Sequence, residues 1–216
     1  VCDINEGDIL LLEISDHQLI DFKDFKTDIS VLTNLCPTHL DYHGSYESYK
    51  NVKHKIFNHH TNTDIAIINK SNYDSLSLTN DILSTKKYFN NDTNYIKNNN
   101  IYLNNKPILN IEDIVLRGIH NYENILAMML VMETLNIDFK YAYEVLKEFK
   151  GVEHRLEYVT TKNGVKYYND SKSTNPTSTV TALKSFDGNI HLILGGMERS
   201  QDFNELNPCL PKVKKI

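Results

Sequence analysis

The chain has 216 residues, of which 40% are hydrophobic and 24% charged, and its formal net charge is −5. This composition is typical of a globular protein, and the acidic balance argues against a nucleic-acid-binding surface. No apolar run approaches the roughly 20 residues of a membrane span. Cys2, Cys36 and Cys209 are far apart and form no CxxC pair, which argues against a disulfide framework or a zinc knuckle and indicates reduced thiols.

Three apolar runs and one capped segment predict an α/β unit in the first part of the chain. Residues 9–14, 29–35 and 64–69 are almost continuously apolar, the pattern of buried parallel strands. Residues 45–59 have apolar positions near helical spacing, and Ser45 can cap a helix there. The order strand, strand, helix, strand predicts an α/β domain with a mostly parallel sheet.

The apolar pattern loosens after residue 86, where asparagine is abundant. Three short runs predict exposed antiparallel strands joined by Asn-rich turns: residues 95–97, 101–103 and 107–109. Residues 121–135 then predict a strongly apolar helix. Residues 138–149 predict a second helix, capped by Asp138.

The spacing of apolar residues changes again after Gly151. Residues 156–161 and 165–169 predict a hairpin, because Asn163 and Gly164 between them suit a two-residue turn.

A further α/β pattern follows this hairpin. Residues 175–185 predict a helix with proline in its first turn, and residues 190–194 predict a buried strand. We therefore expect two domains, residues 1–150 and residues 151–216.

Polar side chains follow the first two predicted strands. A carboxylate at the end of a strand, as at Glu13, can hold Mg²⁺, although ordinary capping explains it as well. His39, Asp41 and His43 are spaced two apart. They could belong to a metal site, which for zinc needs further ligands from elsewhere, or to a polar loop that turns at Gly44.

Two more polar clusters lie at predicted helix starts. Asn121 and Asn124 are one helical turn apart, and their amides could read a base or hold a phosphate; an Asn N-cap is the alternative.

The second of these clusters combines a carboxylate, a hydroxyl and an ammonium, at Asp170, Ser171 and Lys172. A strand-to-helix junction of this kind suits a phosphate or a nucleotide. A capped helix start explains Asn175 and Pro176 but explains the preceding triplet poorly.

In this order, the clusters resemble the Mur ligase family over almost the whole chain. The motifs that carry the resemblance are LEISDHQL (12–19), TNLCPTHLDYHGS (33–45), YKNVKHKIF (49–57), GIHNYEN (118–124), HRLE (154–157), NDSKSTNP (169–176) and LILGGMERSQDF (192–203). NDSKSTN is the most discriminating, because sister ligases that add other amino acids differ there. It selects the members that add D-glutamate.

The resemblance implies a central ATPase-type domain with a mostly parallel sheet, followed by the start of a Rossmann-like α/β C-terminal domain. It also implies a cytoplasmic, monomeric enzyme of peptidoglycan synthesis. Such an enzyme uses ATP and Mg²⁺ to join D-glutamate to UDP-N-acetylmuramoyl-L-alanine. ATP phosphorylates the carboxylate, and the amine of D-glutamate attacks the acyl phosphate to give an amide, ADP and phosphate.

The resemblance also assigns the residues of the metal site. Glu13 and His39 match the family's magnesium ligands, and Lys53 matches a lysine that the family carries as a carbamate, an anion that can bind a second Mg²⁺. His39 and Lys53 are the expected catalytic residues. Without the resemblance, Lys53 is a solvated helix lysine beside Lys50 and Lys55.

The remaining site residues are assigned in the same way. Gln18 matches a contact to the UDP-linked substrate. Thr174 and Arg199 match positions that face the incoming D-glutamate, although many relatives have lysine in place of Arg199, with a different reach and geometry. Five residues match the family's ATP contacts: Asn121, Asn124, Arg155, Asp170 and Lys172.

One departure from the family limits what the chain is expected to do. The family's phosphate loop, GxxGK[ST], does not occur in these 216 residues, and the domain that binds the uracil nucleotide would lie upstream of Glu13. We therefore expect an internal fragment that is inactive alone. Two alternatives stay open: another Mur-type or folylpolyglutamate-type ligase, and a non-catalytic nucleotide-binding module.

Overall fold

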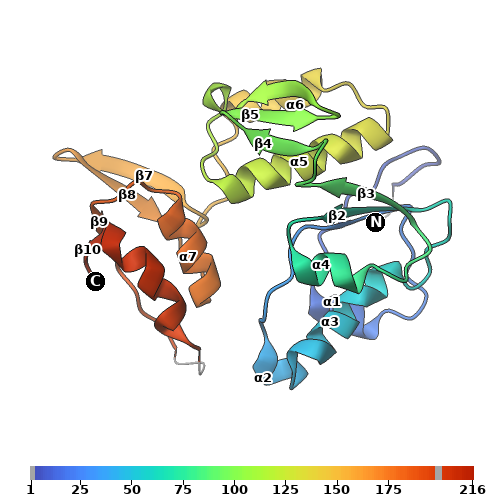
Figure 1. Cartoon of the computed structure of the whole chain (residues 1–216), viewed down its shortest axis with the longest axis horizontal. Coiled ribbons are helices and arrows are strands. Elements are labelled where there is room, and N and C mark those ends of the chain that lie inside the picture. The colour runs from blue at the N-terminus through green and yellow to red at the C-terminus, as the bar shows by residue number, and fades with distance from the viewer. Residues whose placement is uncertain (1–2, 198–200) are drawn as a thin grey trace.

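The computed structural model describes residues 3–197 and 201–216, and its first part contains a parallel sheet (Figure 1). The strands, in spatial order, are β1 (Ile29–Leu32), β2 (Ile65–Asn69) and β3 (Thr85–Phe89). Ile29 lies opposite Ile65, and Ile65 lies opposite Thr85. Because all three strands run parallel, their carboxyl ends meet at one edge, where open sheets of this kind bind ligands.

Five helices belong to the described residues of this part of the chain, and side chains cap three of them. The five are α1 (Asp16–Asp21), α2 (Leu40–His43), α3 (Tyr46–His54), the 3-10 helix η1 (Lys55–Phe57) and α4 (Tyr73–Leu78). Ser15, Ser45 and Asn72 cap α1, α3 and α4, and each accepts the backbone N–H three residues on. The helix predicted at residues 45–59 and the strands predicted at 29–35 and 64–69 are thus confirmed, with somewhat different ends.

An antiparallel sheet follows, and its turns are made of asparagine. Its strands are β4 (Tyr95–Lys97), β5 (Asn100–Leu103) and β6 (Lys106–Asn110), and the 3-10 helix η2 (Ile111–Asp113) comes next. Four turn residues have left-handed backbones, with φ between 48° and 61°: Asn98, Asn99, Asn104 and Asn105. The predicted strands and turns are confirmed. Their predicted exposure is wrong for Ile101, which is fully buried in the main core.

Helix α5 (Ile119–Thr134) is at the centre of the main core. Its Leu126 and Met129 are fully buried in one cluster with Ile67 of β2. The helix begins two residues before the predicted start, and α6 (Lys140–Glu148) follows it. Although α5 has 16 residues, no helix in the described part of the chain combines the length and apolar character needed to cross a membrane.

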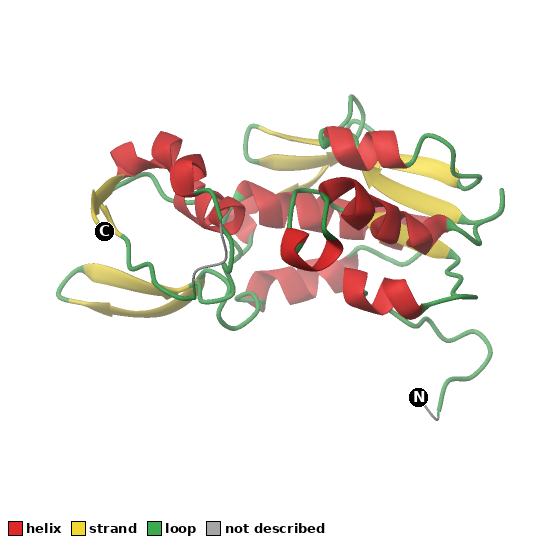
Figure 2. Cartoon of the chain, turned by 90° about the horizontal axis from the view of Figure 1, so that it is seen from below, coloured by secondary structure: helices red, strands yellow, loops and turns green. Residues whose placement is uncertain are grey.

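The last part of the chain lies to one side of the rest, coloured orange to red in Figure 1. It contains the hairpin β7 (Glu157–Lys162) and β8 (Val165–Asn169), helix α7 (Pro176–Lys184), the strand β9 (Ile190–His191), the 3-10 helix η3 (Phe203–Lys212) and the strand β10 (Val213–Lys215). The predicted hairpin is confirmed, and so is the helix, which Asn175 caps. Figure 2 shows the same part from below, with its helices on one side and the strands of the hairpin on the other.

Two apolar runs do not form the strands predicted from them. The run at residues 9–14 forms no strand, and its Leu11 is 90% exposed. In the run at residues 190–194, only the two residues of β9 pair, and Ile193 is exposed. An apolar run becomes a buried strand only where a sheet edge pairs with it and a second layer covers it. Within the described residues, the run at 9–14 pairs with no strand. The second run has both only at its start, where β9 pairs with β10 and Ile190 packs against the cluster of Leu183, Leu206 and Cys209.

Candidate functional site

Helix α1 begins with a capping box that engages Gln18. Ser15 Oγ accepts the N–H of Gln18 at 3.3 Å, and Gln18 Oε1 accepts the N–H of Ser15 at 2.9 Å. This reciprocal pair starts the helix directly after the exposed apolar run. The carboxamide of Gln18 therefore serves the cap here, and a contact with a UDP-linked substrate would have to share or replace that bond.

Asp16, the first residue of α1, is buried and joins two histidines. It is 5% exposed. Its Oδ2 accepts a hydrogen bond from His43 Nε2 at 2.7 Å and lies 3.2 Å from His17 Nδ1. Burial raises the pKa of the Asp16 carboxyl. The hydrogen bonds from His43 and from the backbone, together with the charges of Lys53 and His17, outweigh burial and hold the pKa below its ordinary value. His43 is thus committed to Asp16, and it does not join His39 and Asp41 in a metal cluster.

His39 lies at a left-handed bend, with φ 52° and ψ 34°. Its carbonyl oxygen accepts the N–H groups of Tyr42 at 3.0 Å and His43 at 2.9 Å. Its ring meets the His17 ring edge-on, with centroids 5.3 Å apart. Left-handed backbones are uncommon outside glycine and gather at functional sites. The bend therefore supports a functional role for His39.

Lys53 of α3 belongs to the same group of side chains. Its Nζ lies 5.8 Å from the centre of the Tyr49 ring. Burial lowers the pKa of the Lys53 ammonium, while Asp16 and Glu13 favour its charged form. An amine must be neutral to react with CO₂, so burial assists carbamate formation. Lys50 differs, because its ammonium pairs with a surface carboxylate 2.7 Å away.

The chemistry of these residues fits magnesium. Within the described residues, no three His, Cys, Asp or Glu side chains are placed to hold a metal ion by themselves. Mg²⁺, however, keeps several waters and takes one or two carboxylates together with substrate phosphates. Glu13 is exposed and close enough to Lys53 to act on its charge. A carboxylate at Glu13 and a carbamate at Lys53 would give the oxygen ligands that Mg²⁺ prefers.

A network of side-chain amides covers the carboxyl edge of the parallel sheet. Asn69, buried at the end of β2, donates to Asn34 Oδ1 at 3.1 Å and accepts from Asn90 Nδ2 at 3.0 Å. Asn90 also donates to Glu123 Oε1 of α5 at 2.9 Å. Burial raises the pKa of Glu123, and the bond from Asn90 opposes that shift. Sequence analysis missed this network, although its asparagines all stand at predicted strand ends or in the Asn-rich stretch.

Asn121 and Asn124 lie in the first turns of α5, but neither caps it. The N-cap is Gly118, so the N-cap alternative for Asn121 is wrong. Instead, Asn121 Nδ2 donates to the carbonyl of Arg117 at 2.7 Å. Asn124 is exposed. Both amides stand near the amino end of a long helix, where the helix dipole favours negative charge.

Arg155 and Asp170 meet in a compact loop cluster. Asp170 Oδ1 accepts the N–H of Leu156 at 3.0 Å, and its Oδ2 accepts the hydroxyl of Ser173. Arg155 Nη1 donates to the same hydroxyl at 3.3 Å. Leu156 and His154 have left-handed backbones, with φ 46° and 66°, which surrounding hydrogen bonds must hold in place. The structure thus brings the HRLE and NDSKSTNP motifs together.

Two more predicted residues, Lys172 and Thr174, lie beside this cluster. The backbone N–H of Lys172 donates to the carbonyl of His154 at 3.0 Å. Thr174 is exposed immediately before the cap of α7, and its carbonyl accepts Gln201 Nε2 at 3.2 Å. Arg199 lies outside the described residues.

His120 connects α5 to the loop cluster. Burial lowers the pKa of His120, Arg155 lowers it further, and Asp170 opposes them. These three side chains are therefore near neighbours, and Asn121 follows His120 directly. The structure thus places next to each other the two groups of residues that the resemblance assigns to ATP. Among the described residues, no hydrogen bond or ion pair joins them to the Asp16, His39 and Lys53 group.

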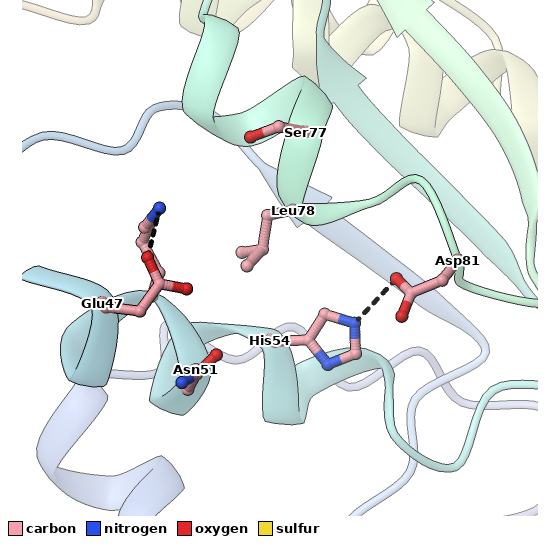
Figure 3. A pocket seen from close by; sticks show the side chains of 7 residues that line it. Glu47, Asn51, His54, Ser77, Leu78 and Asp81 are labelled. Carbon is pink, nitrogen blue, oxygen red and sulfur yellow. Dashed lines mark ion pairs between the residues drawn. The ribbon is translucent and has the colours of Figure 1, made fainter.

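Two surface pockets lie away from all of these residues. One, of about 290 Å³, lies between α3 and α4, and Figure 3 shows His54 pointing across it toward Asp81, with Nε2 and Oδ1 3.5 Å apart. The other, of about 380 Å³, lies beside β6 and α6. Neither pocket contains a residue that the sequence assigns to the site.

Two family models match the chain. The Mur ligase middle domain matches residues 3–132, and the Mur ligase glutamate ligase domain matches residues 154–216. The UDP-N-acetylmuramoylalanine--D-glutamate ligase of Bacillus mycoides is 41% identical over 98% of this chain and 48% of its own length. The ligase of the same name from a Geobacillus species is 41% identical over 96% of this chain and 47% of its own. The chain therefore spans about half the length of the curated relatives it matches.

Solved structures show the same fold. The MurF ligase of Thermotoga maritima in complex with ADP is 21% identical, with a TM-score of 0.63 over 85% of this chain and 46% of that chain. MurF of Acinetobacter baumannii is 16% identical, with a TM-score of 0.62 over 73% of this chain and 37% of that chain. These likenesses confirm the predicted α/β architecture. The middle-domain model alone covers more than half of the chain, and the chain belongs to the Mur ligase family.

Proposed function

We propose that the chain forms part of an ATP-dependent ligase that joins D-glutamate to UDP-N-acetylmuramoyl-L-alanine. The observation that carries this proposal is the 41% identity, over 98% of the chain, to the Bacillus mycoides ligase of that name. The match of residues 154–216 to a glutamate ligase domain supports the choice of amino acid. The clustered HRLE and NDSKSTNP motifs support it independently.

The reaction needs an activated acyl group. Transfer of the γ-phosphoryl group of ATP to the alanine carboxylate gives ADP and an acyl phosphate. The amine of D-glutamate, after losing a proton, attacks the carbonyl carbon; phosphate then leaves with the electrons of the broken C–O bond. Such a reaction depends mainly on placing the reactants and neutralising negative charge.

The first group of residues would bind the metal. When bound, Mg²⁺ would neutralise negative charge on the phosphates. Glu13 and His39 would hold one Mg²⁺, and Lys53, as a carbamate, would bind a second. To form that carbamate, neutral Lys53 Nζ attacks the carbon of CO₂; a C–N bond forms while the electrons of one C–O π bond move to oxygen, and the nitrogen passes a proton to water. Gln18, at the start of α1, would contact the UDP-linked substrate.

The second group of residues would bind ATP and the amino acid. The amides of Asn121 and Asn124 would face the nucleotide from α5. Arg155, Asp170 and Lys172 would face it from the loop cluster, where cationic groups suit phosphates. Thr174 and Arg199 would face D-glutamate.

Several wider properties follow from this proposal. Residues 1–150 would form the middle domain and residues 151–216 the glutamate ligase domain; the two family matches, ending at residue 132 and starting at residue 154, support a boundary near Lys150. The enzyme would act as a monomer in the cytoplasm, where ATP is available. It would serve cell-wall biogenesis and, through the wall, cell shape and cell division.

Omission of single substrates from an activity assay tests the proposal. The purified product of the whole gene is incubated with ATP and Mg²⁺. ADP is then measured with both proposed substrates present or with one of them left out. We expect sustained ADP formation only in the complete mixture. ADP formation at the same rate without the UDP-linked substrate would show a different reaction, and no ADP in the complete mixture would favour a non-catalytic module.

A further inference from the structure

Helix α2 is attached to the protein in an unusual way. It is a single turn whose Leu40 is 43% exposed and whose Tyr42 is 58% exposed. Apolar burial, which attaches most helices, contributes little here. Some other contact must therefore fix the position of this turn.

Within the described residues, the one side-chain hydrogen bond that α2 makes joins His43 to Asp16, and the Tyr42 ring also lies against the His17 ring, with centroids 4.5 Å apart. The side chain of His43 is 2% exposed, and its Nε2 lies 2.7 Å from Asp16 Oδ2. The carboxylate itself is fixed, because it stands at the head of α1, whose Leu19 is buried. Removing one partner of a buried polar pair leaves the other unpaired, so the pair strongly favours one arrangement.

His39 depends on this attachment through the backbone. The N–H of His43 donates to the carbonyl of His39 at 2.9 Å, across the whole turn. The side chain of His39 makes no capping hydrogen bond of its own. When His43 is held in place, the bend at His39 is held with it.

Lys53 lies near the same Asp16–His43 pair, with the ring of Tyr49 between them. The ring of Tyr49 meets the His43 ring edge-on, with centroids 5.3 Å apart, and lies 5.8 Å below Lys53 Nζ. Tyr49 is itself buried. The hydrogen-bonded pair of Asp16 and His43 is thus close to both His39 and Lys53, the expected catalytic residues.

We propose that Asp16 is a positioning residue, which holds His39 at the proposed metal site by fixing helix α2 through His43. The proposal rests on the proposed function for the role of His39. Removal of a residue that holds a metal ligand in place typically lowers metal affinity 10- to 100-fold.

A metal titration tests the proposal without any activity assay. Ring signals of His39 are followed by NMR in the purified gene product, and are assigned with His39→Gln. Mn²⁺ alone is added as a paramagnetic stand-in for Mg²⁺. Asp16→Ala should shift the His39 signals before metal is added, and should raise the Mn²⁺ concentration that broadens them at least about tenfold.

Two matched variants separate positioning from simple loss of stability. Asp16→Asn keeps an oxygen that can accept the bond from His43, so the Mn²⁺ response of His39 should stay within about threefold of the unmodified protein. Asp64 is also buried, at the opposite edge of the sheet, where it accepts the hydroxyl of Thr61 at 2.9 Å and pairs with Lys26 at 3.1 Å. Asp64→Ala should lower stability and leave the His39 signals unchanged.

The outcomes also separate this proposal from the proposed function. If His39 fails to respond to Mn²⁺, or responds equally in Asp16→Ala and Asp64→Ala, Asp16 does not position a metal ligand. If His39 responds as expected but the gene product forms no ADP, the positioning role stands and the ligase assignment fails. In an active enzyme, Asp16→Ala and His43→Ala should be non-additive in kcat, because both break one bond; additive losses would overturn the proposal.

Discussion

Gly118, before α5, lies against Ser185, after α7: a Cβ on Gly118 would be 2.6 Å from Ser185 Oγ and 2.6 Å from the His120 ring. Both distances are shorter than real Cβ contacts allow. Figure 1 shows this approach between the start of α5 and the orange helix α7. The two parts of the chain that carry the proposed ATP contacts therefore meet at a glycine that leaves no room for a side chain.

Gly118→Ala should destabilise the protein for two reasons. The φ of 96° is unfavourable for any residue with a Cβ, and the new methyl group must displace His120 or Ser185. We expect a loss of about 2–4 kcal/mol in the free energy of unfolding, measured with urea. Gly164 is the matched control, because its φ is 77° but a Cβ there would meet nothing within 4 Å. Gly164→Ala should lose only about 1–2 kcal/mol, and equal losses would contradict the close packing.

His60 should make stability depend on pH. It is buried at the amino edge of the parallel sheet, with Nδ1 2.6 Å from Ser84 Oγ and Nε2 3.1 Å from Ser30 Oγ. Burial lowers its pKa below 6.5, although Asp64 opposes this shift. The unfolded chain therefore binds a proton at higher pH than the folded chain does. The contribution of His60 to the free energy of unfolding is therefore complete above pH 6.5 and decreases as the pH drops toward the pKa of the folded state.

Urea unfolding between pH 7.5 and pH 5 measures this effect. The slope from His60 should reach at most about 1.4 kcal/mol per pH unit. His60→Gln should be less stable at neutral pH but should have a flatter profile. An unchanged slope in His60→Gln would assign the dependence to other groups.

Lys53→Ala in the active gene product should reduce kcat by at least about 100-fold, because it removes the proposed anionic ligand. Lys53→Arg should be equally inactive, since a guanidinium does not form a carbamate under these conditions. Added formate or acetate should restore part of the activity of Lys53→Ala by supplying a carboxylate. Lys50→Ala, on the same helix, should retain activity. No rescue by either acid would count against the carbamate.

Asp170→Asn should raise the KM for ATP about tenfold, because the carboxylate holds both the Leu156 N–H and the Ser173 hydroxyl, and charged hydrogen bonds are worth about 1.5–3 kcal/mol. Steady-state kinetics with varied ATP measure it. Asp138→Asn, at the exposed start of α6, should leave KM unchanged. If both variants behave alike, the loop cluster has no special role in ATP binding.

Local signals in the sequence predicted much of the fold. Ser45, Asn175 and the Asn163–Gly164 turn act over a few residues, and the elements they specify are confirmed. Helix α1 was missed although the Ser15 and Gln18 spacing of its capping box is visible in the sequence. The strand expected at residues 9–14 failed because pairing is a property of the neighbouring chain, which an apolar run does not encode.

The site was less predictable than the fold. Family resemblance named His39 and Lys53, but nothing in the spacing of residues indicated that Asp16 binds His43, 27 positions away. The same holds for the bond between Asn90 and Glu123, 33 positions apart. Such pairs depend on how helices and strands pack, and only the folded chain brings them together.

The amino-acid specificity of the reaction tests the central claim most directly. The purified gene product is given ATP, Mg²⁺ and UDP-N-acetylmuramoyl-L-alanine, with D-glutamate, L-alanine or L-lysine, and the nucleotide product is identified by mass spectrometry. The account predicts phosphate release and a product enlarged by one glutamyl residue with D-glutamate alone. Comparable phosphate release and a corresponding product with L-alanine or L-lysine would contradict it.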